Sequence, residues 1–320
     1  MNFDKFHVIA VISNPICYQS RYKLYEIFAE DLKRKGATLW TVEMQTGMRP
    51  QRVTNDQDWK HIQLWSSAIP GEVWHKENLL NIALQHMTRE CPDWRYVAWI
   101  DADVKFEAGA LEKTYHALQH FDVVQMWSHA TDFGPDGGIV GNIHKSFMYC
   151  HWHNIEVKNS SGYLLGGHPG FAWAARRDAL NKLGSSMSGP LIDFAALGSG
   201  DRHMACGLIG RVLESVHGDM HPTYRRWLMQ WQTQAEQNIK RNVGYVSNTI
   251  RHMWHGRKAD RGYSSRWQIL VKHQFNPETD LARDVSGIWR LVSDSPRQQA
   301  LRDDIRRYFR ARQEDATTLH

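Results

Sequence analysis

Apolar and polar positions show two different periodicities in the first part of the chain. His7 to Ser13 and Leu39 to Glu43 are short apolar, β-branched runs, which is the pattern of strands buried on both faces. From Ser20 to Lys35 apolar residues recur at helical spacing, and Gly36 ends that pattern. A strand, a helix and a strand within about 38 residues predict a βαβ unit and a parallel sheet.

The later segments continue this alternation of strands and helices and are then interrupted by a glycine-rich segment. Leu64 and Trp65 predict a short edge strand, and Thr131 to Asn142 is glycine-rich and predicts an irregular loop or hairpin. The same periodicities predict helices over 74–87, 109–120, 202–213, 224–242 and 296–314, and strands over 96–100, 121–127, 171–175 and 243–250, the last running on to residue 256.

The composition is that of an ordinary globular protein with a basic surface. Hydrophobic residues make up 42% and charged residues 23%, which excludes a disordered chain, and no apolar run approaches the ~20 residues of a membrane span. Asp4 and His7 argue against a signal peptide, and the four cysteines are widely spaced. We therefore expect a cytoplasmic protein, in the host cytoplasm if the gene is viral. The net charge of +5 favours a polyanion or substrate phosphates as partner.

Two aspartates stand where the buried run from Tyr96 to Ile100 ends. Asp101 and Asp103 would lie at the carboxyl edge of a sheet, where open α/β folds hold their ligands. Carboxylates at i and i+2 can face one divalent cation that keeps phosphate oxygens in its shell. The alternative is an acidic turn before the helix predicted near Gly109.

The sequence lacks a glycine-rich phosphate cradle, so a nucleotide here would depend on a metal at Asp103. His252 and His255, in H-M-W-H-G, stand at the end of a late strand and suit a transition metal. Because residues i and i+3 reach one ion only in a turn, we expect one ligand and one neighbour. Both could instead be histidines bonded to backbone, and His151 with His153 is a rival pair without a carboxylate beside it.

Asp201 follows Gly198-Ser199-Gly200 and precedes a predicted helix. An aspartate in that position is typical of an N-cap, worth about 1 kcal/mol to the helix. Glycines beside it also let a bulky substrate approach the backbone, which suits a general base. The residues alone favour the cap.

Taken in order, these features resemble a GT-A glycosyltransferase of the family 2 type over residues 6–267. The resemblance rests on five places, namely the strand ending at Asn14-Pro15, the strand ending at Glu43, the segment Lys76 to Asn81, Asp101-Ala102-Asp103, and the block from Gly167 to Met204 with Trp173, Arg176-Arg177 and Gly200-Asp201. H-M-W-H-G, followed by Arg261, Tyr263 and Arg266, is similar to the late metal-ligand strand of metal-dependent members.

The resemblance implies an α/β fold of the GT-A type, Rossmann-like, with a mostly parallel central sheet flanked by helices. It implies a glycosyltransferase domain over 1–267, with a nucleotide-binding half over 1–127 and an acceptor half with the metal-ligand strand over 128–267. Residues 268–320 are expected to form a helical C-terminal extension.

The resemblance also implies roles for single residues. Asn14, Pro15 and Glu43 would hold the nucleoside, and Asp201 would deprotonate the acceptor hydroxyl for an inverting attack. Mn²⁺ or Mg²⁺ would be held by Asp101, Asp103, His252 and His255. Further contacts to the nucleotide-sugar donor, most often a UDP-sugar, are expected from Arg21, Lys76, Asn81 and Asp101, and Trp173 would stack on a sugar or acceptor ring.

One departure from the family affects the acceptor. Many relatives carry Glu before the Asp, whereas Gly200 leaves no second carboxylate in this segment for acceptor hydroxyls. Five arginines between Arg302 and Arg312 are typical of a solvated face but could also contact phosphates. The predicted acceptor is therefore a 5-hydroxymethylpyrimidine base in DNA, as in phage genomes. A saccharide, lipid-linked or protein acceptor is the alternative, and a non-catalytic nucleic-acid-binding protein is the alternative of another class. We expect no membrane and no obligate protein partner.

Overall fold

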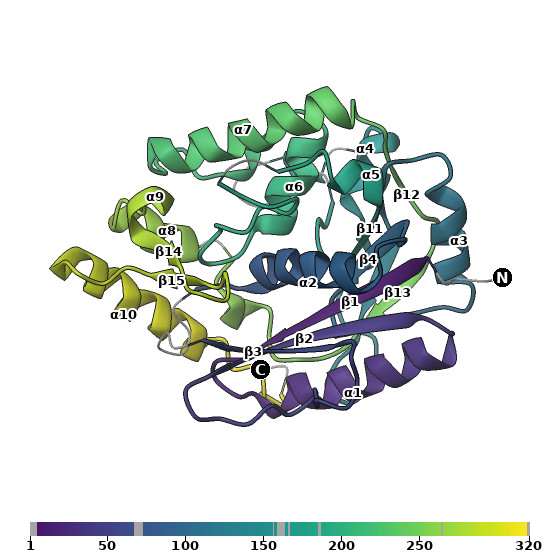
Figure 1. Cartoon of the computed structure of the whole chain (residues 1–320), viewed down its shortest axis with the longest axis horizontal. Coiled ribbons are helices and arrows are strands. Elements are labelled where there is room, and N and C mark those ends of the chain that lie inside the picture. Colours follow the sequence, from purple (N-terminus) through teal and green to yellow (C-terminus); the bar gives the residue numbers. More distant parts are fainter. Residues whose placement is uncertain are drawn as a thin grey trace.

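A seven-stranded sheet forms the centre of the protein (Figure 1). The computed structural model describes residues 5–66, 73–155, 157–158, 164–165, 167–184, 187–263 and 265–318. The strand order is β12-β6-β11-β4-β1-β2-β3, and every neighbouring pair is parallel except the two that β11 makes. The strands are β1 (Phe6–Ser13), β2 (Thr38–Thr46), β3 (His61–Ser66), β4 (Tyr96–Ile100), β6 (Val123–Gln125), β11 (Ala172–Arg176) and β12 (Val243–Tyr245). The predicted α/β class with a mostly parallel central sheet is confirmed.

Alternate residues of each strand enter different cores on the two faces of this sheet. Helices α1 (Gln19–Arg34) and α3 (Ala110–Ala117) pack on one face, where Val8 and Ala98 point. Helix α2 (Lys76–Glu90) packs on the other face, where Ile9 and Val97 point. In Figure 1, α1 and α2 accordingly lie on opposite sides of β1 and β2. The continuous apolar runs of the sequence follow from this burial on both faces.

The direction of the chain reverses between β1 and β4. From β1 the chain adds β2 and β3 on one side, and α2 then returns it to β4 on the other side of β1. The carboxyl ends of β1 and β4 therefore diverge into a crevice, which is where open α/β sheets bind ligands. Asn14 follows β1 at this edge, and Asp101 and Asp103 follow β4.

A second sheet brings the late histidines to this crevice. It has the order β5-β13-β7-β8, with β5 (Val104–Phe106), β7 (His129–Asp132), β8 (His144–Lys145) and β13 (Thr249–His252). Its register places His252 opposite both Val104 and Asp132. The sequence predicted one strand over 243–250 and onward, and this was wrong, because β12 joins the central sheet and β13 joins the second.

The remaining elements lie around these sheets, and the described residues contain no helix long and apolar enough to cross a membrane. Leu301 and Ile305 of the last helix share a core with Leu79 and Leu80 of α2, so the C-terminal segment packs against the sheet domain. That segment also contains a β-hairpin that was not predicted. The elements are α4 (Phe147–Trp152), β9 (Val157–Lys158), β10 (Leu164–Leu165), α5 (Arg177–Leu180), α6 (Gly200–Leu208), η1 (Val212–Ser215), α7 (Pro222–Asn238), η2 (Ala259–Arg261), α8 (Ser265–Lys272), α9 (Pro277–Asp280), β14 (Leu281–Arg283), β15 (Trp289–Leu291) and α10 (Pro296–Ala311).

Candidate functional site

A cavity of about 770 Å³ occupies the crevice at the carboxyl edge of the sheet. Its walls come from the ends of β1 and β4, the start of α2, the segments 168–171 and 198–202, and the C-terminal residues 309–314. Most of the site residues expected from the sequence line it, namely Asn14, Pro15, Arg21, Lys76, Asp101, Asp103, Asp201, His252 and His255. Glu43, Asn81 and Trp173 do not line it.

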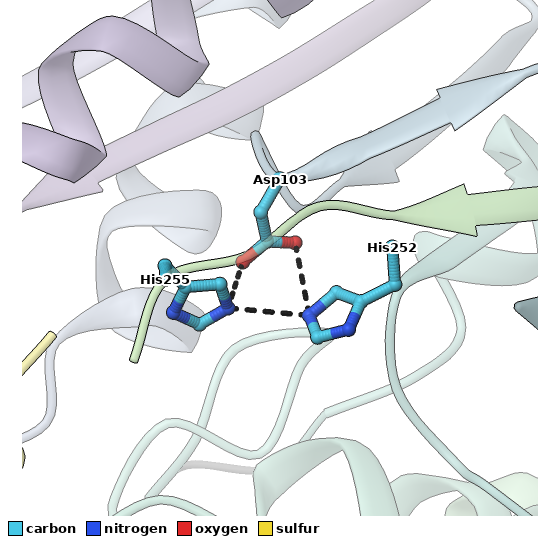
Figure 2. A group of neighbouring side chains, drawn as sticks. All are labelled: Asp103, His252 and His255. Atoms are coloured by element: carbon cyan, nitrogen blue, oxygen red, sulfur yellow. Dashed lines mark hydrogen bonds and ion pairs between the residues drawn. The ribbon is translucent and has the colours of Figure 1, made fainter. Parts of the chain in front are cut away.

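Asp103, His252 and His255 form a candidate metal centre in the wall of this cavity. One ligand atom from each of the three lies within 4.8 Å of the others. Nε2 of His255 is 2.9 Å from Oδ2 of Asp103 and 3.2 Å from Nε2 of His252. Figure 2 shows the carboxylate and the two rings turned toward one another. We expected only one of the two histidines to reach an ion; in the structure a ring nitrogen of each lies within 4.8 Å of the Asp103 carboxylate and of the other ring.

The chemistry of this group fits a divalent cation. Oδ1 of Asp103 is buried and has no hydrogen-bond partner among the described residues. Burial, reinforced by the charge of Arg261, lowers the pKa of His255 to about 4, so its ring is neutral and can act as a ligand at pH 7. Neutral imidazole with a carboxylate suits Mn²⁺ better than Mg²⁺, which prefers oxygen ligands.

Asp132 holds the His252 ring in its orientation. Its Oδ1 lies 2.7 Å from Nδ1 of His252, which leaves Nε2 facing Asp103. Its Oδ2 contacts His144 at 2.5 Å and also pairs with Lys258. Burial acts to raise the pKa of Asp132, but the hydrogen bonds from these partners hold it far below its usual range. A carboxylate behind a ligating histidine is a common device for fixing the ring. No sequence pattern pointed to Asp132, because its segment was expected to be an irregular loop.

Asp101 stands beside the three ligands without joining them. Its carboxylate pairs with Lys76 at the start of α2, and it is not in the metal-ligand group of the described residues. Direct binding of a metal by Asp101 stays a prediction. Lys76 instead places a positive charge at the edge of the cavity next to the Asp101 carboxylate.

The C-terminal segment forms a wall of the cavity that the sequence did not reveal. Glu314 accepts hydrogen bonds from Nη2 of Arg21 at 3.0 Å and from Nε of Arg312 at 2.6 Å. The Arg312 guanidinium lies 5.1 Å from the centre of the Trp74 ring, which stacks with Phe309 at 6.3 Å. Trp74 and Phe309 thus give the cavity a stacked aromatic pair in its wall.

Three predicted site residues, Glu43, Asn81 and Trp173, lie outside the cavity lining and make structural contacts. The buried Glu43 carboxylate accepts three backbone N–H bonds from residues 52–54, of 2.8 to 3.0 Å, and so anchors that loop. Asn81 bonds both backbone groups of Leu191. Trp173 is 2% exposed and donates to the carbonyl of Pro169 at 2.7 Å. The stacking role predicted for Trp173 is wrong for this arrangement, because its ring packs in the core and not in the cavity wall.

Asp201 lies inside the first turn of α6 and points at the cavity. The N-cap of α6 is Ser199, held at a left-handed φ of 86°, so the expectation that Asp201 only caps the helix is wrong. Its Oδ2 packs against Gly170, where an added Cβ would lie 2.6 Å from that oxygen. The rival histidines at 151 and 153 lie outside the metal group of the described residues, and His153 bonds Tyr245.

Comparisons with known proteins give structural matches only. No family model matches the chain, and no curated protein does. S. aureus TarS 1–349 matches over 95% of this chain and 70% of its own, at 12% identity and a TM-score of 0.38. A mutant of Drosophila β1,4-galactosyltransferase 7, in complex with manganese, UDP-Gal and xylobiose, matches over 92% and 98%, at 10% identity and a TM-score of 0.40. Mannose-1-phosphate geranyltransferase from Thermus thermophilus matches over 78% and 74%, at 10% identity and a TM-score of 0.32. At these identities and TM-scores the matches do not assign roles to residues, so the site is interpreted from its own geometry.

Proposed function

We propose that this protein is a metal-dependent glycosyltransferase that moves a sugar from a nucleotide diphosphate sugar, best a UDP-sugar, to an acceptor hydroxyl with inversion. The observation that carries the proposal is the group Asp103, His252 and His255 in the wall of the cavity at the reversal point of an α/β sheet. Asp201 lines the same cavity and supplies a carboxylate for the acceptor.

The donor is held at the ends of β1 and α2. Asn14 and Pro15 line the cavity after the end of β1, which supports a role for them in binding the nucleoside. Arg21 and Lys76 provide positive charge for the diphosphate, and each is already oriented by a carboxylate, Glu314 for Arg21 and Asp101 for Lys76. When bound, the divalent cation neutralises the diphosphate and stabilises it as the leaving group.

Asp201 acts as the general base. It accepts the proton of the acceptor hydroxyl while the oxygen of that hydroxyl forms a bond to the anomeric carbon. The bond from that carbon to the diphosphate oxygen breaks on the opposite face, and the nucleoside diphosphate leaves with the bonding electrons. One displacement inverts the anomeric configuration, and general-base assistance of this kind contributes about 10²–10⁴ in rate.

The cation group gives the direct test. Asp103→Ala should abolish Mn²⁺-stimulated hydrolysis of a mixture of UDP-sugars and should weaken Mn²⁺ binding, because it removes the carboxylate of the group. Asp93→Ala is the matched control, since Asp93 is 71% exposed and pairs with Lys5 on the surface. Wild-type turnover in Asp103→Ala, or in wild-type protein with excess EDTA, would show that the metal plays no part.

The DNA acceptor remains a prediction, with one surface feature in its support. Of the arginines on the C-terminal helix, Arg302 pairs with Asp303 and Arg307 with Asp304, whereas Arg306 and Arg310 have no ion pair within the part of the chain that the structure describes. A smaller cavity of about 340 Å³ is lined by Arg49, Arg306 and Arg310 with Pro15 and Ile16. A nucleic-acid-binding protein without activity, the alternative of another class, would share this basic cavity but would not hydrolyse UDP-sugars.

A further inference from the structure

The Glu77 side chain lies in the cavity wall, at the position where a side chain on Gly200 would project. A Cβ added to Gly200 would lie 2.6 Å from Cδ of Glu77, 2.8 Å from its Cγ and 2.8 Å from the backbone carbonyl oxygen of Ile192. Contacts this short do not occur between real Cβ atoms and their neighbours. The Glu77 carboxyl, which comes from the first turn of α2, therefore fills the position that a side chain at residue 200 of α6 would take.

This arrangement places a second carboxyl beside the proposed base. Asp201 directly follows Gly200 in α6, and both Glu77 and Asp201 line the large cavity. Glu77 is only 3% exposed and lines the cavity, so its carboxyl is shielded from bulk water. The sequence implied that Gly200 leaves no second carboxylate next to Asp201, and the fold supplies one from a helix more than a hundred residues earlier.

We propose that Glu77 and Asp201 together bind the acceptor, and that the acceptor is a saccharide or similar polyol presenting two neighbouring hydroxyl groups. Two carboxylates held side by side repel each other, and two hydroxyl donors relieve that repulsion. Asp201 takes the proton of the attacking hydroxyl. Glu77 accepts a hydrogen bond from the adjacent hydroxyl and so selects which oxygen attacks. A hydroxymethylated base offers a single hydroxyl and leaves Glu77 without a partner. This inference rests on the proposed transferase function.

Moving the carboxylate from residue 77 to residue 200 tests the geometry by thermal stability, without any activity assay. Gly200→Glu should lower the melting temperature strongly, because its side chain collides with Glu77 and adds a third buried carboxylate. Glu77→Ala should relieve the part of that loss that comes from the Glu77 side chain, so that the double variant is more stable than Gly200→Glu alone, although the contact of Cβ with the Ile192 carbonyl oxygen remains. Gly218→Glu is the control, because a Cβ at Gly218 meets nothing within 4 Å. Additive effects of the two substitutions would overturn the proposed exchange of space.

The same variants test the acceptor. Each is incubated with Mn²⁺, mixed UDP-hexoses and either a panel of methyl glycosides or a hydroxymethylcytosine oligonucleotide, and products are identified by mass spectrometry. Wild-type protein should glycosylate a glycoside. Glu77→Ala and the isosteric Glu77→Gln should raise the KM for that glycoside about 10–100-fold, the effect of losing one charged hydrogen bond, without a parallel rise in the KM for the UDP-sugar. Glu77→Ala/Gly200→Glu should recover part of the loss.

The possible failures are distinguishable. UDP-sugar hydrolysis with transfer to the oligonucleotide and to no glycoside would overturn the polyol acceptor and leave the transferase intact. An unchanged glycoside KM in both Glu77 variants would overturn the role of Glu77. A wild-type protein that neither hydrolyses UDP-sugars nor transfers a sugar would overturn the proposed function itself, and the acceptor with it.

Discussion

Glu77 links the protonation of one buried carboxyl to the stability of the whole protein. Burial, with the charge of Asp201 adding to it and Lys76 opposing it, raises the pKa of Glu77 from 4.5 to about 7. The folded state therefore holds this proton more tightly than the unfolded state does. Below pH 4.5 both states are protonated and stability is unaffected. As the pH rises through 7, the folded state loses up to about 3 kcal/mol relative to the protonated protein.

Glu77→Gln should remove this dependence. The free energy of unfolding of the variant, minus that of the wild type, should become more positive between pH 4.5 and pH 7.5. The wild type loses stability over this range, whereas glutamine has no proton to lose. Urea denaturation in EDTA at a series of pH values measures the difference. Parallel stability curves for the two proteins would mean that Glu77 titrates normally in the folded state.

At the scale of single elements, strand pairing decides which residues form the candidate metal group. β13 pairs with β5 and β7, so that the N–H of Met253 bonds the carbonyl of Asp103 at 2.8 Å and His252 faces Asp132. A slip of one residue would turn His252 to the other face of the sheet. The register of a short strand thus positions the candidate metal ligands.

The segment after α10 is a second element with a positional role. Glu314 is 3% exposed and neutralises both Arg21 and Arg312, and although burial acts to raise its pKa, these two charges hold it far below the usual range. Glu314→Gln would leave the buried Arg312 guanidinium and the partly buried Arg21 guanidinium without their carboxylate.

We expect Glu314→Gln to lower the free energy of unfolding by about 3 kcal/mol, the usual cost of breaking a buried ion pair from one side. Asp303→Asn is the control, because Asp303 is 54% exposed and exposed pairs contribute less than about 1 kcal/mol. Chemical denaturation at pH 7 compares the two variants. Equal losses would mean that the C-terminal segment does not hold Arg21 in place.

At the scale of the whole molecule, some positively charged side chains are ion-paired and others can still bind an anionic partner. The net charge is +5, but many cations are paired, and Arg306 and Arg310, which have no ion pair among the described residues, gather with Arg49 beside the end of β1. Because released counterions drive binding to polyanions, each phosphate contact should contribute about −0.9 to the slope of log K against log salt.

Binding of duplex DNA should therefore discriminate between neighbouring arginines. Arg306→Ala with Arg310→Ala should weaken binding and flatten the salt slope by about 2, whereas Arg307→Ala should change it less, since Arg307 already pairs with Asp304. Fluorescence anisotropy over a salt series measures both slopes. If no duplex binds even at low salt, DNA is removed from the possible acceptors while transfer to glycosides is unaffected.

The periodicity of the chain was enough to predict the fold class and much of the candidate site. Continuous β-branched runs fix the central strands because both of their faces are buried, and residues just beyond a strand end must lie at the sheet edge. Asn14, Asp101, Asp103 and Asp201 were placed in the cavity wall by that argument or by the family resemblance, and all four line it. Local sequence carries this information because it depends on the neighbours of a residue along the chain.

Long-range pairing decided the rest. Which histidines meet Asp103, and that Asp132 orients one of them, depends on the register between β5, β7 and β13, which no local pattern specifies. That Trp173 is core, that Glu314 lies in the cavity wall, and that Glu77 fills the space beside Gly200 are likewise contacts between distant segments. The sequence determined which surfaces must be buried, and only the packed tertiary structure determined which buried groups face one another.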